Sequence, residues 1–143
     1  MTTDTALETV TLDGQQYRRN DLSDNAQSQV DSLRFVDTEL QELTNRLAVL
    51  QTARAAYAEE LAGLLPEKKA PANKKKDVVT IDGAKYNRAD FSEQGLAQLA
   101  NLQFTQGEIE RLTNRQAVFR TARNAYAQTL ADELKHVSPV TAH

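Results

Sequence analysis

The 143-residue sequence contains no cysteine, no tryptophan and only two histidines. The absence of cysteine excludes disulfide bonds, a thiolate nucleophile and sulfur-ligated metals, so we expect a cytoplasmic protein that packing alone stabilises. His136 and His143 both lie near Ser138 and Pro139, in an end of the chain typical of disorder. Neither has a base or a nucleophile held beside it. We therefore expect no enzymatic activity, no bound metal and no cofactor.

The sequence also has few glycines, no long apolar run and no strong excess of one charge. The five glycines are dispersed and form no phosphate-binding loop. No apolar segment approaches the roughly 20 residues that a membrane span needs, and the N-terminus lacks the basic and apolar regions of a signal peptide. The net charge of -3 predicts no overall field that would attract nucleic acid. We therefore expect neither secretion nor membrane insertion.

What the sequence does contain is an internal repeat. Residues 10–65 align without a gap with residues 79–134, at an offset of 69 residues, and 27 of the 56 aligned positions are identical. Such self-similarity predicts that both copies adopt the same local structure. Each copy is about half the size of an ordinary domain, so we expect the two copies to share a core.

The segments outside the repeats differ from them in composition. Residues 66–78 contain two prolines, five lysines and almost nothing to bury, which predicts a linker. We interpret its lysines as a solubilising spacer, with an anionic surface or nucleic acid as the alternative. Residues 1–9 and 135–143 are predicted to be disordered ends.

Each copy begins with the pattern of a β-hairpin. Asp13–Gly14 is flanked by Val10, Leu12 and Tyr17, and the pattern recurs at residues 79–86. An Asp-Gly pair between alternating apolar residues predicts a two-residue turn with positive φ at both positions. Val10 then faces Tyr17, and the apolar residues share one face of the hairpin. A lone hairpin is marginally stable in water, so this face must dock on the adjacent helix.

A long helix is predicted after each hairpin. Ser23 and Ser92 are placed to cap the first turn, and the apolar residues that follow recur at alternating steps of three and four, which predicts a heptad seam. Residues 36–38 and 105–107 leave open whether each helix is continuous or broken. The seam positions are Leu33, Val36, Leu40, Leu43, Leu47, Leu50, Tyr57, Leu61 and Leu64, with looser equivalents at Leu102, Thr105, Ile109, Leu112, Gln116, Phe119, Tyr126, Leu130 and Glu133.

The length of these helices restricts how they can pair. A continuous helix of 43 residues spans about 64 Å, whereas a 13-residue linker spans at most about 45 Å. An antiparallel pair is therefore favoured, although a broken helix would allow a parallel one, and a four-helix bundle is the alternative. The predicted fold is mainly α-helical. It is a tandem repeat of β-hairpin plus long helix that forms an antiparallel, coiled-coil-like bundle with pseudo-twofold symmetry.

Several motifs together resemble a known family. They are the V-T-[LI]-D-G-x-x-Y hairpin, the Leu-Ser or Phe-Ser cap, the Leu-x-Phe at residues 33–35 and the Thr-Ala-Arg-x-Ala-Tyr at residues 52–57. This pattern resembles a family of short bacterial and phage proteins that carries only a domain-of-unknown-function label. Its members look like single copies of the unit, which implies that this chain imitates a homodimer. The resemblance implies no activity, cofactor or catalytic residue.

The seam is interrupted by an arginine, Arg54 in the first copy and Arg123 in the second. Burying an unpaired arginine costs several kcal/mol, so each must find a carboxylate, reach water or bind a ligand. In the antiparallel register the expected partner of Arg54 is Glu108, and that of Arg123 is Asp37 or Glu39. Such a buried pair would also specify the register.

The same arginines are candidate binding residues. Arginine and tyrosine dominate binding hot spots, so Arg54 with Tyr57, and Arg123 with Tyr126, are candidates for contact with an anionic group or a partner protein. A second repeated polar block lies two turns earlier on each helix and is a further candidate surface. Its members are Asn45, Arg46, Asn114 and Arg115.

These features favour a non-catalytic structural or protein-interaction module that presents a helical face to an unidentified protein partner or to a second copy of the chain. The alternative hypothesis is a nucleic-acid-associated or regulatory factor of bacterial or phage origin. It would use the linker lysines with Arg46, Arg54, Arg115, Arg120 and Arg123. Binding to DNA or RNA that falls steeply with salt would favour this alternative.

Overall fold

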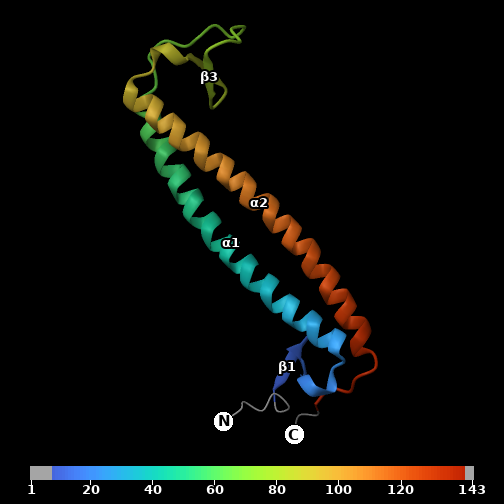
Figure 1. Ribbon diagram of the computed structural model, residues 1–143. Coiled ribbons are helices and arrows are strands. Elements are labelled where there is room, and N and C mark those ends of the chain that lie inside the picture. Colours follow the sequence, from blue (N-terminus) through green and yellow to red (C-terminus); the bar gives the residue numbers. More distant parts are fainter. Residues whose placement is uncertain (1–7, 141–143) are drawn as a thin grey trace. The chain divides into compact units, whose positions relative to one another are not determined.

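The computed structural model describes residues 8–140, which are mainly helical (Figure 1). Both long helices are continuous, because residues 36–38 and 105–107 are helical. The elements are β1 (Thr9–Leu12), β2 (Gln15–Arg18), η2 (Arg19–Asp21), α1 (Asp24–Ala62), β3 (Val78–Ile81), β4 (Ala84–Asn87), η3 (Arg88–Asp90) and α2 (Glu93–Leu134).

The chain divides into two compact units, and neither coincides with one sequence repeat. Unit 1 comprises Met1–Leu43 and Arg115–His143, and unit 2 comprises Thr44–Asn114. Each unit therefore contains one hairpin, the first part of the helix that follows it, and the last part of the other copy's helix. The two copies thus exchange the ends of their helices.

The hairpins confirm the predicted turn and register. Val10 pairs with Tyr17 in the antiparallel β1–β2 ladder. Asp13 and Gly14 have φ angles of 50° and 80°, the left-handed values that a two-residue hairpin turn requires. The hairpin of residues 78–87 has the same register and turn. Equivalent sequences therefore form equivalent hairpins.

The predicted serine caps are also present. The Ser23 hydroxyl accepts a hydrogen bond from the Ala26 amide at 3.0 Å, and the Ser92 hydroxyl accepts one from the Gly95 amide at 3.0 Å. Each bond satisfies one of the amides that a helix start leaves without an intrahelical partner. The short 3₁₀ helices η2 and η3, which precede these caps, were not predicted from the sequence.

The core of unit 1 lies under its hairpin. The apolar face of β1 and β2 packs on the start of α1, and one buried leucine comes from α2. The buried residues are Val10, Tyr17, Leu22, Ala26, Val30, Leu33 and Leu130. Docking of the hairpin on the helix is therefore confirmed.

Polar contacts establish the direction of the helices within unit 1. The Asn25 amide donates to Glu133 at 2.6 Å, and further along α1 the Asp37 carboxylate accepts from Arg123 at 2.6 Å. As α1 advances from residue 25 to residue 37, its contacts on α2 go back from residue 133 to residue 123. These two helix segments are therefore antiparallel.

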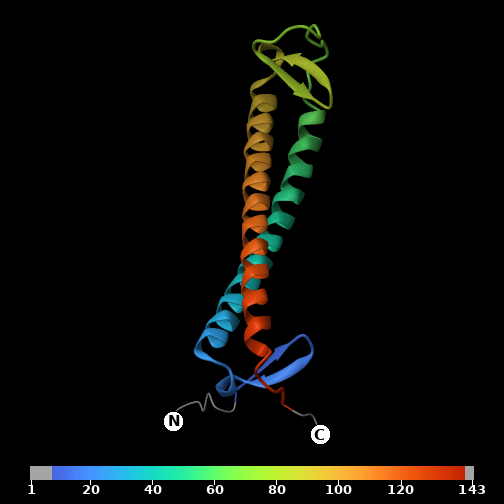
Figure 2. The same ribbon diagram turned by 90° about the vertical axis from the view of Figure 1, so that its right-hand side faces the viewer.

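The core of unit 2 also lies under its hairpin. Leu61, at the end of α1, is buried with Val79 and Tyr86 of the hairpin and with Phe91 and Leu99. Figure 2 shows the β3–β4 hairpin next to the green end of α1. The Tyr86 and Phe91 rings meet edge to face, with centroids 6.1 Å apart. Leu61 is the repeat equivalent of Leu130 in unit 1. In each unit, the other copy therefore supplies the same leucine.

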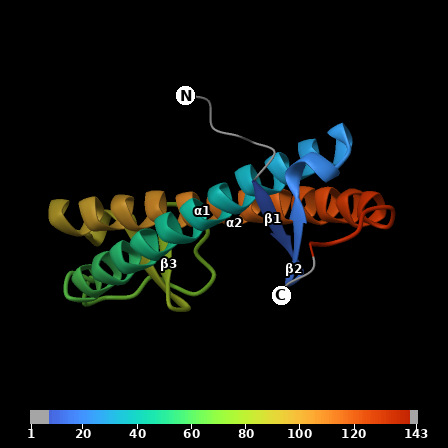
Figure 3. The same cartoon turned by 90° about the horizontal axis from the view of Figure 1, so that it is seen from below.

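The segments that follow the helices pack on the hairpins. The Ala70 amide donates to the Lys85 carbonyl at 2.8 Å, and Ala70 is buried, so the predicted linker contributes to unit 2. In unit 1 the Val140 amide donates to the Gln16 carbonyl at 2.6 Å, and Figure 3 shows this segment returning towards β2. Gln16 and Lys85 are repeat equivalents. Each hairpin thus binds the chain that leaves the other copy's helix.

The ends of the chain differ from the expectation of disorder where the structure describes them. Thr9 belongs to β1, and Val137 packs against the core of unit 1. The expectations for residues 1–7 and 141–143 lie outside the described residues.

The predicted seam positions are buried or half-buried throughout both helices. Even the polar positions of the second copy follow this pattern, because Thr105 and Gln116 are buried. The Thr105 hydroxyl donates to the Asn101 carbonyl one turn earlier, at 2.7 Å. This bond satisfies the hydroxyl inside the packed surface.

Candidate functional site

The seam arginines are exposed and not buried. The Arg123 guanidinium donates to the Asp37 carboxylate at 2.6 Å, and these side chains are 45% and 51% exposed. Asp37 is one of the two partners expected from the sequence. The long arginine stem brings its charge to water, so no desolvation penalty arises, and such a surface pair contributes at most about 1 kcal/mol.

The prediction that Arg54 pairs with Glu108 is wrong. Glu108 binds Arg111 on its own helix, at 2.8 and 3.1 Å, and this hydrogen bonding lowers the pKa of Glu108. The Arg54 side chain forms no hydrogen bond or ion pair with any residue between 8 and 140. The repeat equivalent of Asp37 is Gln106, which carries no charge. A neutral side chain therefore stands where the other copy has a carboxylate.

Arg54 borders a cavity of about 280 Å³ in unit 2. The cavity lies between the last part of α1, the β3–β4 turn and the first part of α2, and its lining is mainly apolar. Apart from Arg54 and several alanines, its lining residues are Leu61, Leu65, Ile81, Asp82, Leu102 and Gln106. An unpaired guanidinium at an apolar hollow is suited to binding an anionic group.

A second arginine of unit 2, which sequence reasoning missed, also lacks the carboxylate partner that its equivalent in unit 1 has. In unit 1, Arg19 of η2 binds Asp31 through two hydrogen bonds, at 2.9 and 3.0 Å. This pair lowers the pKa of Asp31 and raises that of Arg19. The repeat equivalents are Arg88 and Ala100. The Arg88 side chain has no hydrogen-bond or ionic partner within the described part of the chain.

Arg88 borders a cavity of about 290 Å³ that adjoins the first. Leu99 and Gln103 line it from α2. The two cavities share four lining residues, Ile81, Asp82, Leu102 and Gln106. Arg54 and Arg88 therefore lie at the two sides of one hollowed region, which we call the arginine face and define by Arg54, Arg88 and these four residues.

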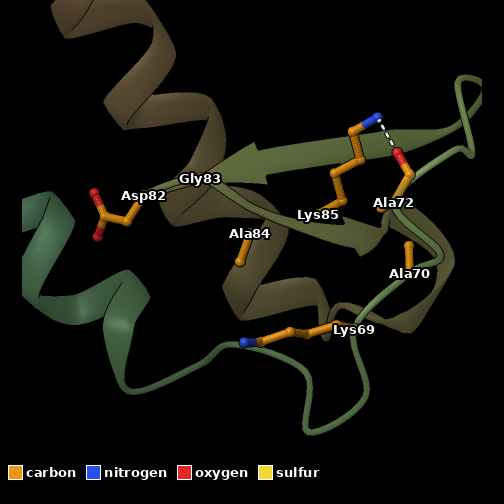
Figure 4. Close-up of a pocket in the computed structure, with 7 residues that line it drawn as sticks. All are labelled: Lys69, Ala70, Ala72, Asp82, Gly83, Ala84 and Lys85. Carbon is orange, nitrogen blue, oxygen red and sulfur yellow. Dashed lines mark hydrogen bonds between the residues drawn. The ribbon is translucent and has the colours of Figure 1, made fainter.

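A third hollow of about 450 Å³ lies beside the same hairpin (Figure 4). In it the Lys85 ammonium donates to the carbonyls of Ala72 and Lys74, at 2.8 and 3.1 Å. The Lys74 ammonium in turn donates to Asn87. These lysines hold the segment after α1 on the hairpin, so their charges are engaged within unit 2.

The structure does not bring the other sequence candidates into this region. Tyr57 is half-buried but does not line the cavity beside Arg54, and Tyr126 packs against the core of unit 1. The second polar block is exposed, and the boundary between the units falls at it. Its residues are Asn45, Arg46, Asn114 and Arg115.

Between residues 8 and 140, no three or more histidine, aspartate or glutamate side chains are grouped so as to hold a metal ion. Of the helices in this range, none combines the length and the hydrophobicity that crossing a membrane requires.

The fold and the arginine face define a class, a mainly helical protein in which two hairpins are each packed on two long helices. No protein-family model, no curated protein and no solved structure matches the chain. The arginine face is therefore interpreted from its own chemistry.

Proposed function

We propose that the protein is a non-catalytic structural and protein-interaction module. The observation that carries this proposal is a set of large apolar side chains exposed at matching positions of both copies. Phe35 and Phe104 are 61% and 70% exposed, and Val49 and Val118 are 69% and 67% exposed. Each pair is related by the 69-residue offset. Burial of such side chains against a partner supplies binding free energy.

Both units present the same two residue types. Phe35 and Val118 belong to unit 1, and Phe104 and Val49 belong to unit 2. Each pair combines one residue from α1 with one from α2. This recurrence supports a function in which each unit offers an equivalent contact to a protein partner or to a second copy of the chain.

We also propose the finer description of the fold, an antiparallel coiled-coil-like bundle of two repeats with pseudo-twofold symmetry. Equivalent hairpin registers, serine caps and leucine contacts in the two units support it. The resemblance to single-copy bacterial and phage proteins fits this proposal, because a single copy would need a second chain to supply the missing helix end.

The nucleic-acid hypothesis is the weaker one. Unit 1, which contains Arg115, Arg120 and Arg123, has seven lysines and arginines against eleven carboxylates. Arg123 is already bound to Asp37. A surface with an excess of negative charge repels the phosphate backbone.

The test is a paired substitution, Phe35→Ser with Phe104→Ser. We expect the wild-type protein to associate with itself or to capture a host protein, and the variant to lose this association by about tenfold or more. Sedimentation velocity over a range of concentrations measures self-association, and affinity capture from the native host measures a partner. Ala48→Ser with Ala117→Ser is the matched control, because these positions are exposed and repeat-equivalent. Unchanged association in the phenylalanine variant would contradict the proposal.

A further inference from the structure

We infer that the arginine face of unit 2 binds an acidic segment of a partner protein, with one carboxylate on Arg54 and another on Arg88. The inference deepens the proposed function and depends on it, since it names the chemistry of the partner. Unit 1 acts as the internal reference, because the same arginine positions there are occupied by carboxylates of the chain itself.

Unit 1 shows that both arginine positions bind carboxylates. Arg123 binds Asp37 at 2.6 Å, and Arg19 binds Asp31 at 2.9 and 3.0 Å. The Arg19–Asp31 contact is of the two-bond kind that the guanidinium favours, whereas Arg123 makes a single bond through Nε. Both equivalent positions of unit 2 also carry an arginine, but the positions of the two acids do not carry acids.

Both arginines of unit 2 lack a carboxylate of the chain itself. Gln106 replaces the acid beside Arg54, and Ala100 replaces the acid beside Arg88. These positions are six residues apart on α2, which is about 9 Å along the helix axis. Two acidic residues two or three positions apart in an extended peptide span about 7 to 10 Å. We therefore expect the two acids of the partner segment to be two or three positions apart.

Two of the four residues that line both cavities between the arginines are aliphatic, and the other two are Asp82 and Gln106. Ile81 and Leu102 line both adjoining cavities, of about 280 and 290 Å³. Each is slightly smaller than the roughly 300 to 1,000 Å³ of a site for a drug-sized molecule, and suits a peptide side chain. We therefore expect an aliphatic residue between the two acids of the partner segment.

The charge of the two units favours the same assignment. Unit 2 has ten lysines and arginines against nine carboxylates, whereas unit 1 has seven against eleven. An acidic segment is therefore attracted to unit 2 and repelled by unit 1. Asp82 lines both cavities and opposes this attraction, so its charge should weaken the binding.

The experiment measures fluorescence anisotropy of a labelled peptide, Ser-Glu-Leu-Ser-Glu-Ser, with the full chain at low salt. We expect saturable binding that Arg54→Gln and Arg88→Gln each weaken by about tenfold or more. Arg123→Gln in unit 1 is the matched control and should leave the affinity unchanged. Asp82→Asn, which keeps a residue tolerant of the left-handed turn, should tighten the binding.

A second variant retains both arginines and restores the acids of unit 1. Ala100→Asp with Gln106→Asp should abolish peptide binding, because the carboxylates of the chain then occupy Arg88 and Arg54. Circular dichroism and thermal melting check that this variant is folded. Unchanged binding in this folded variant would overturn the inference, as would equal weakening by Arg123→Gln.

Two further outcomes separate this inference from the proposed function. If wild type does not bind the peptide at low salt, the acidic-segment inference fails, while association that depends on Phe35 and Phe104 can persist. If a DNA duplex binds with the same dependence on Arg54 and Arg88, and the peptide does not, the arginine face belongs to a nucleic-acid ligand and the inference is overturned.

Discussion

At the scale of single residues, the two copies differ in two acids that bind arginines. Asp31 and Asp37 hold arginines in unit 1, and their equivalents Ala100 and Gln106 cannot. The aligned sequences show this difference, but they do not show that these acids bind arginines. Arg19 is 12 residues from Asp31 along the chain, and Arg123 is 86 residues from Asp37.

The Arg19–Asp31 pair predicts a pH-dependent contribution to stability. The hydrogen-bonded Arg19 lowers the pKa of Asp31 in the folded state, so the unfolded chain binds more protons near that pKa. The contribution is complete above the ordinary carboxylate pKa of about 3.9 and is lost as the pH falls through the lowered folded value. We expect Asp31→Asn to cost at most about 1 kcal/mol at pH 7, since Asp31 is mainly exposed.

Urea unfolding of wild type and Asp31→Asn at pH 7, 5, 4 and 3 measures this contribution. The difference in the free energy of unfolding should shrink only below about pH 4 and should also shrink in high salt. A difference that stays constant from pH 7 to pH 3 would show that Asp31 acts by something other than its charge.

At the scale of elements, the helix starts show compensating changes of volume. The first copy combines Leu22 with Ala26, and the second combines the larger Phe91 with Gly95. A Cβ added at Gly95 would lie 3.3 Å from a Phe91 ring carbon and 3.4 Å from the Leu64 carbonyl oxygen. The phenylalanine therefore uses space that a glycine leaves open.

This pairing predicts non-additive substitutions. Gly95→Ala alone gains up to about 1 kcal/mol of helix propensity, but it crowds Phe91, so we expect little net change in stability. Phe91→Leu alone leaves unfilled volume and should destabilise by about 1 kcal/mol or more. The double variant restores the pair of the first copy and should be more stable than the sum of the two single changes. Thermal unfolding of all four proteins gives the coupling, and strict additivity would refute the compensation.

The elements themselves were largely predictable. The Asp-Gly turns, the serine caps and the spacing of seam residues such as Leu43 and Leu112 are local patterns, and the structure confirms them. The 3₁₀ helices and the packing of residues 66–77 and 135–140 were not predicted. Those segments have weak local patterns, and their positions depend on hydrogen bonds to the other copy's hairpin.

At the scale of the whole molecule, each core depends on a helix end from the other copy. Leu61 lies in the first repeat but is buried with Val79 and Tyr86 of the second hairpin, and Leu130 completes the core beside Val10 and Tyr17. The core of each unit is therefore built from residues of both sequence repeats.

This exchange predicts crossed effects of mutation. Leu61→Ala removes a fully buried side chain and should destabilise by about 2 to 5 kcal/mol. We expect it to reduce the hydrogen-exchange protection of the second hairpin, residues 78–87, more than that of the first. Leu130→Ala should do the reverse, and the two variants are controls for each other. Loss of protection confined to the hairpin of the same copy would contradict the exchange.

The sequence by itself determined the duplication, the two hairpins, the helix starts and the apolar seam, because each depends on residues within a few positions of one another. Asp37 was also one of the two partners predicted for Arg123, since an antiparallel register relates these residues directly. Only the tertiary structure decided that the repeats exchange helix ends, that the linker packs on a hairpin, and that Arg54 and Arg88 lack acids. These features depend on which distant side chains the register brings together. The predicted partner of Arg54, Glu108, is only two residues from Gln106, the residue that is equivalent to Asp37.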